Sequence, residues 1–108
     1  MEKIIIVEDD KIIREELQSF LGRYGYEVVV PRELENIVEF ILKENSDLVL
    51  LDINLPIYDG YYICREIRKK SEVPIIIVTS RDSDMDELMS MNLGADDFVT
   101  KPYNTQIL

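Results

Sequence analysis

The chain has 108 residues, and its 22 acidic and 12 basic side chains give a formal net charge of −10. This length suits one small domain with a single hydrophobic core, and the negative charge argues against binding nucleic acid through phosphate contacts. The lone cysteine, Cys64, cannot form an internal disulfide, and a chain without histidine has no Ser-His-Asp triad or Cys/His zinc cluster. No apolar stretch approaches the ~20 residues that span a bilayer, and we expect a cytoplasmic chain without a leader peptide or membrane association.

Apolar runs predict five strands. The runs at residues 4–7, 48–51 and 75–78 are continuous rather than alternating, which is typical of parallel strands covered on both faces. Shorter β-type segments at 27–30 and 98–100 complete the set. We therefore expect five strands that alternate with helices along the chain.

Between these runs, apolar residues recur at helical spacing. The inward-facing residues predicted for four helices, in chain order, are Ile13, Leu17, Phe20, Leu21 and Tyr24; Leu34, Ile37, Val38, Ile41 and Leu42; Ile63 and Ile67; and Leu88 and Met89. The third helix starts after Gly60, and Gly94 ends the fourth at 83–93. Residues 105–108 predict the first turn of a fifth helix, which is then truncated. Strict alternation of strands and helices favours right-handed crossovers and a parallel, doubly wound α/β sheet.

Acidic residues follow two of the predicted strands directly. Asp52 comes after 48–51, and Glu8, Asp9 and Asp10 come after 4–7. In open α/β sheets the carboxyl ends of the strands form the crevice where ligands bind, so Asp52 is a candidate anionic nucleophile there. Up to four carboxylates at one edge would need a cation to neutralise them. Asp10 immediately precedes a helix, and for it a cap is the favoured interpretation.

Four motifs at the ends of predicted strands carry a family resemblance: Glu8-Asp9, Asp52, Thr79 and Lys101-Pro102. Leu55-Pro56 with Asp59-Gly60, and the residues 94–97, lie between them and also match. Over its whole length the chain resembles the receiver domain of a two-component response regulator, and 94–102 resembles the OmpR/PhoB class of winged-helix transcriptional regulators. The resemblance implies one receiver domain at 1–108, with a flavodoxin-like five-stranded sheet of order 2-1-3-4-5. It also implies a C-terminal DNA-binding domain that is absent from this chain.

The resemblance assigns a phosphorylation site and a metal site. Asp52 would accept a phosphoryl group from a sensor histidine kinase and form an acyl phosphate. Mg²⁺ would be bound by Asp9, Asp52 and the backbone carbonyl of Asn54, with Glu8 acting through a water molecule. The chain would also catalyse its own dephosphorylation, but its role is that of a signalling switch rather than an enzyme.

The resemblance also assigns a switch. Lys101 and the hydroxyl of Thr79 would donate to phosphoryl oxygens. Movement of Thr79 would let Phe98 turn inward and change the surface made by 83–93, 98–100 and the fifth helix. That surface would control a transcriptional output and a phosphorylation-dependent homodimer. Because 83–93 contains no Lys or Arg, a more apolar dimer contact is the alternative to ion pairs across it.

Other functions of the same fold fit less well. An aspartyl-phosphate phosphohydrolase usually has a second acid two residues after the nucleophile, where this chain has Asn54. A flavin carrier needs a phosphate-binding loop after the first strand, and Glu8-Asp9-Asp10 would repel that anion. The remaining alternative is a receiver-like protein-binding module that works without phosphorylation.

Overall fold

A computed structural model of the protein describes residues 2–31, 35–52, 60–79, 95 and 97–100, with the backbone alone at Thr79 and 97–100. The elements in chain order are β1 (Lys3–Val7), α1 (Lys11–Arg23), β2 (Glu27–Val29), α2 (Ile37–Glu44), β3 (Leu48–Leu51), α3 (Gly60–Arg68), β4 (Ile75–Thr79) and β5 (Asp97–Thr100). The five strands agree with the predicted runs to within a residue at either end. The predicted helices at 83–93 and 105–108 lie outside the described residues.

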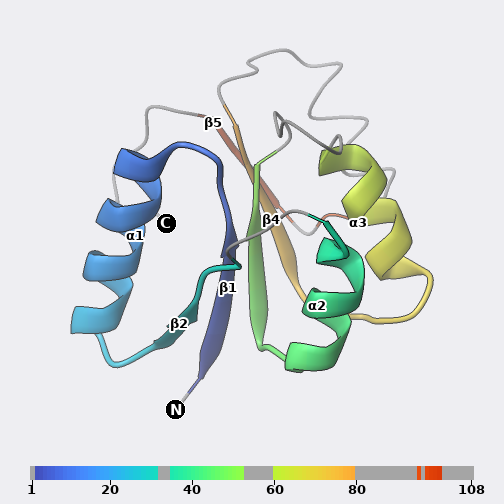
Figure 1. The fold of residues 1–108 in the computed structure, drawn as a ribbon, viewed down its shortest axis with the longest axis horizontal. Helices are drawn as coiled ribbons and strands as arrows, with labels where there is room; N and C mark the ends of the chain where they lie inside the picture. Colours follow the sequence, from blue (N-terminus) through green and yellow to red (C-terminus); the bar gives the residue numbers. More distant parts are fainter. Residues whose placement is uncertain (1, 32–34, 53–59, 80–94, 96, 101–108) are drawn as a thin grey trace.

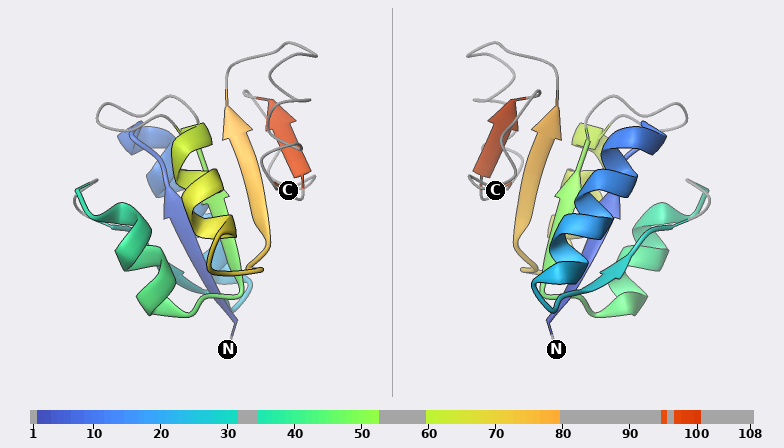
Figure 2. Two further views of the ribbon diagram at one scale, coloured as in Figure 1. Left: turned by 90° about the vertical axis from the view of Figure 1, so that its right-hand side faces the viewer. Right: turned by 90° about the vertical axis from the view of Figure 1, so that its left-hand side faces the viewer.

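The strands form one sheet of order β2-β1-β3-β4-β5, in which every neighbouring pair is parallel. This arrangement confirms the flavodoxin-like fold. Helix α1 covers one face of the sheet, and α2 and α3 cover the other (Figures 1 and 2). In the register, Val7 pairs with Leu51, and Leu51 pairs with Ile77. The carboxyl ends of β1, β3 and β4 therefore reach the same edge of the sheet.

The two faces of the sheet carry separate apolar clusters. Ile5 and Val7 of β1 pack with the cluster that includes α2 and α3, whereas Ile4 and Ile6 pack with α1. Most inward-facing predictions are confirmed as buried or packed against these clusters: Ile13, Leu17, Phe20, Leu21, Ile37, Val38, Ile41, Leu42, Ile63 and Ile67. Cys64 is likewise buried on α3, as a small apolar side chain would be.

The prediction for Tyr24 is wrong. Helix α1 ends at Arg23, Tyr24 is its C-cap, and the Tyr24 side chain is 70% exposed. The chain then turns through Gly25, whose φ of +89° favours glycine. Leu34, Leu88 and Met89, also predicted to face inward, lie outside the described residues. Among the helices that the structure describes, none is long and apolar enough to cross a membrane.

Candidate functional site

The turn after β1 carries three acids in different environments. Glu8 is buried with 7% of its surface exposed, whereas Asp9 and Asp10 are exposed. The Glu8 carboxylate accepts a hydrogen bond from the backbone N–H of Asp10 at 3.0 Å. This bond folds the turn back on itself and fixes the direction of the buried carboxylate.

Asp10 caps α1. Its Oδ1 accepts the backbone N–H groups of Ile12 at 2.9 Å and Ile13 at 3.2 Å, two of the donors that a helix N-terminus leaves without a helical partner. The cap interpretation is confirmed. Of the three acids in this turn, Asp10 therefore has a structural role at the start of α1.

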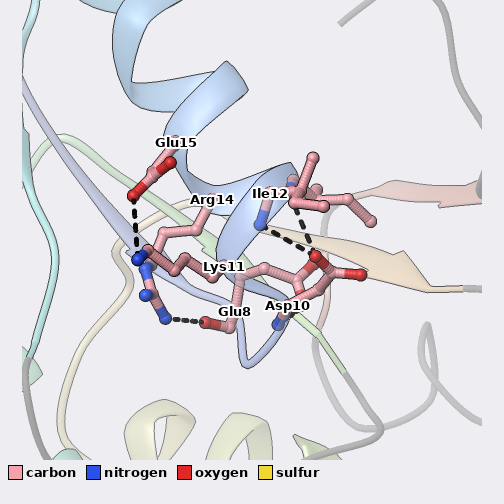
Figure 3. A network of polar contacts seen from close by, with 7 residues as sticks. Glu8, Asp10, Lys11, Ile12, Arg14 and Glu15 are labelled. Atoms are coloured by element: carbon pink, nitrogen blue, oxygen red, sulfur yellow. Dashed lines mark hydrogen bonds and ion pairs between the residues drawn. The ribbon is translucent and has the colours of Figure 1, made fainter.

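A basic side chain of α1 reaches back to the same turn. Nη1 of Arg14 donates a hydrogen bond to the backbone carbonyl of Glu8 at 3.2 Å (Figure 3). Lys11, on the same helix, instead lies 4.0 Å from the Glu15 carboxylate in an exposed pair. Arg14 was not predicted from the sequence. Its partner is a backbone carbonyl six residues earlier, and such a contact has no sequence motif.

Asp52 stands beside the β1 turn. It directly follows β3, is buried with 5% of its surface exposed, and donates its backbone N–H to the carbonyl of Val7 at 3.0 Å. Because Val7 pairs with Leu51, the residues that follow them, Glu8 and Asp52, leave neighbouring strands at the same level. Two buried acids thus occupy adjacent positions on the carboxyl edge.

The next two strands bring further predicted residues toward this edge. Thr79 ends β4 and its backbone pairs with Thr100, the last residue of β5; Phe98 of β5 pairs with Ile77. Lys101 follows Thr100 in the sequence and, like Asn54, lies outside the described residues. The backbone therefore brings the strand ends at Asp9, Asp52 and Thr79 to one edge.

The chemistry of this edge suits a hard cation. Glu8, Asp9 and Asp52 offer carboxylate oxygens, which are the ligands that Mg²⁺ prefers. In the part of the chain that the structure describes, no group of three or more Asp, Glu, His or Cys side chains is arranged to hold a metal ion. Mg²⁺ needs only one or two carboxylates because it keeps several waters, so the donor set fits it.

Comparison with known proteins identifies the family. Residues 4–108 match the family described as response regulator receiver domain. The chain belongs to this family. It is 47% identical over 108 residues to the transcriptional regulatory protein YxdJ of Bacillus subtilis (strain 168), and the match spans all of this chain and 47% of YxdJ. The receiver domain thus spans about half the length of that curated relative.

Solved structures agree. The BeF3-activated N-terminal receiver domain of RstA from Klebsiella pneumoniae is 39% identical with a TM-score of 0.91, covering 98% of this chain and 91% of that one. The N-terminal domain of the nisin resistance regulator NsrR, a lantibiotic response regulator, is 36% identical with a TM-score of 0.89, covering 99% and 91%. These relatives are consistent with the OmpR/PhoB-like class. Receiver domains are signalling switches that interact with histidine kinases and are typically attached to an output domain.

Proposed function

We propose that this receiver domain accepts a phosphoryl group on Asp52 from a sensor histidine kinase and thereby controls a transcriptional output in the cytoplasm. The observation that carries the proposal is the position of Asp52, a buried acid directly after β3, beside the buried Glu8 that directly follows β1. Aspartate and glutamate are among the residues least often buried in proteins, so two buried acids side by side point to chemistry at this edge of the sheet. In a family of signalling switches, phosphorylation would be the functional reason for a buried acid at this position.

The reaction is a displacement at phosphorus. A carboxylate oxygen of Asp52 forms a bond to phosphorus as the bond to the donor breaks, which leaves an acyl phosphate on the protein. Asp9, Asp52 and the backbone carbonyl of Asn54 would hold Mg²⁺, with Glu8 acting through water. Bound there, the ion would neutralise charge on the phosphoryl oxygens. The protein contributes alignment, which the paired ends of β1 and β3 provide.

We assign the switch to Thr79, Lys101 and Phe98. Lys101 and the Thr79 hydroxyl donate to phosphoryl oxygens, and Phe98 responds by turning inward. Support comes from the backbone, since Thr79 and Phe98 lie on β4 and β5, which pair along their length. Phosphorylation then shifts a pre-existing equilibrium of the surface that includes β5.

The output belongs to a longer protein. Because YxdJ is a transcriptional regulatory protein and this chain covers 47% of it, we propose a C-terminal DNA-binding domain that the receiver regulates. The receiver itself, with a net charge of −10, is not expected to bind nucleic acid. A phosphorylation-dependent homodimer through the β5 surface would couple the two domains.

The decisive experiment is intact mass after incubation with acetyl phosphate and Mg²⁺, with and without a chelator. We expect a metal-dependent gain of one phosphoryl group (about 80 Da), the mark of an acyl-phosphate intermediate. Asp52→Asn should remove the gain. Asp47→Asn is the matched control, because Asp47 lies one residue before β3 at the opposite edge of the sheet, and it should retain the gain.

The alternative, a protein-binding module that works without phosphorylation, predicts a different result. A folded parent chain that gains no mass, or an Asp52→Asn variant that gains as much as the parent, would contradict phosphorylation at Asp52. The first result favours the binding module. The second moves the phosphorylation site to another side chain.

A further inference from the structure

We propose that Arg14 is a positioning residue, which holds Asp9 in the orientation needed to bind Mg²⁺; this inference rests on the metal site in the proposed function. Arg14 lies on α1, next to the acidic turn. It contacts the backbone of that turn, where its Nη1 donates to the carbonyl of Glu8 at 3.2 Å (Figure 3).

The bonded carbonyl belongs to the peptide unit that joins Glu8 to Asp9. Because a peptide unit is planar, a hydrogen bond to its oxygen fixes the orientation of the whole unit, including the nitrogen of Asp9. That orientation in turn limits where the Asp9 side chain can point. Arg14 is half-buried, and its guanidinium is held at the turn by this hydrogen bond. The contact therefore controls Asp9 through the backbone.

The neighbouring parts of the turn are held by other bonds. On the β1 side, the Val7 carbonyl accepts the N–H of Asp52 at 3.0 Å. On the α1 side, the N–H of Asp10 donates to the Glu8 carboxylate at 3.0 Å, and the Asp10 side chain caps the helix. Between these anchors, the Arg14 bond acts on the peptide that carries Asp9. Its loss would free this peptide while leaving both anchors in place.

Charge and geometry predict opposite effects of removing Arg14. A cation near a Mg²⁺ site repels the ion, so loss of the positive charge alone would tighten Mg²⁺ binding. Loss of a bond that orients a ligand would weaken it. The sign of the change therefore separates a positioning role from a general electrostatic one.

The test compares the parent chain with Arg14→Ala, Arg14→Lys and Lys11→Ala. Lys11→Ala is the matched control, because it removes the same charge from the same helix at a side chain that is 74% exposed and paired with Glu15. Mg²⁺ binding is measured by isothermal titration calorimetry, and the rate of phosphorylation by acetyl phosphate is measured as a function of Mg²⁺ concentration. Thermal unfolding shows that each variant is folded.

We expect Arg14→Ala to weaken Mg²⁺ binding by about tenfold, as the loss of a group that orients a metal ligand typically does. Its phosphorylation rate should return toward that of the parent at saturating Mg²⁺, because the nucleophile Asp52 is held by its own strand. Arg14→Lys should recover part of the affinity through its remaining donor. Lys11→Ala should bind Mg²⁺ as well as the parent or slightly better.

Unchanged or tighter Mg²⁺ binding by Arg14→Ala would overturn the inference while leaving the proposed function intact. The positioning role also fails if Lys11→Ala weakens binding equally. If the parent chain binds no Mg²⁺, the proposed metal site and this inference both fail. Should Arg14→Ala not fold, Arg14→Gln replaces it, since glutamine keeps part of the apolar stem and lacks the charge and the reach.

Discussion

Strand β3 has an aspartate at each end, and the two serve different purposes. Asp47, before the strand, is exposed; its Oδ2 accepts the backbone N–H of Lys3 at 2.7 Å, and its own N–H donates to the Lys3 carbonyl at 2.8 Å. Asp52, after the strand, is buried with 5% of its surface exposed. The exposed Asp47 carboxylate thus links the start of β3 to β1 by a hydrogen bond, whereas Asp52 is shielded from solvent.

The surroundings extend the contrast. At the amino edge of the sheet, the Lys3 ammonium lies 3.8 Å from the Glu44 carboxylate and donates to the Glu44 carbonyl at 3.2 Å. At the carboxyl edge, Asp52 directly follows β3, and the residue that directly follows the neighbouring β1 is another buried acid, Glu8. Opposite charges pair at the amino edge, whereas two acids are buried side by side at the carboxyl edge. The amino edge is therefore arranged for stability, and the carboxyl edge for chemistry, which proteins commonly retain at some cost in stability.

The largest change in stability should follow from substituting Asp52. Asp52→Asn replaces one of two buried acids at similar volume, and because residues kept for function are often not those that stabilise the fold best, we expect it to raise the free energy of unfolding by about 2 kcal/mol without Mg²⁺. Urea denaturation of both proteins in a chelating buffer measures the difference. Adding Mg²⁺ should reduce the difference in free energy of unfolding between the two proteins, because the ion stabilises the parent more than the variant. A variant less stable than the parent in chelator would mean that the Asp52 carboxylate contributes to stability there.

The fold was predictable because its signals are local. Continuous apolar runs marked β3 and its neighbours, alternation with helices favoured a parallel sheet, and an aspartate before an amphipathic segment predicted the Asp10 cap. The same local order of motifs identified the family. The candidate site followed in outline, since acids after two buried strands must meet if those strands are neighbours.

The remainder depends on three-dimensional context. The run at 4–7 is apolar at every position, so its sequence does not indicate which residues face which side of the sheet. In the structure Ile4 and Ile6 face α1, and Ile5 and Val7 face α2 and α3. Tyr24 continues the helical spacing, but the helix has ended by then and the ring is exposed. Arg14 was not anticipated because its partner is a backbone carbonyl, and every residue has one.

Asp10 tests whether an acid at the carboxyl edge can have a purely structural role. Asp10→Ala removes the acceptor for two N–H groups at the start of α1, and we expect it to lower the free energy of unfolding by about 1 kcal/mol. Asp10→Asn keeps a capping oxygen without the charge and should be as stable as the parent or slightly more so. Both variants should still take up a phosphoryl group. Loss of uptake in Asp10→Asn, with the fold intact, would place Asp10 among the reacting groups.

Asp47 gives the smallest expected effect and completes the contrast along β3. Asp47→Ala removes the acceptor for the Lys3 N–H, but both groups are at the surface, where water replaces the lost bond; we expect a decrease of about 0.5–1 kcal/mol in the free energy of unfolding. Phosphorylation and Mg²⁺ affinity should match the parent, because the change lies at the opposite edge of the sheet. Urea denaturation and the mass assay measure the two properties on one sample. A fall in phosphorylation at unchanged stability would show that the amino edge also influences the chemistry, and the division between the two ends of β3 would no longer hold.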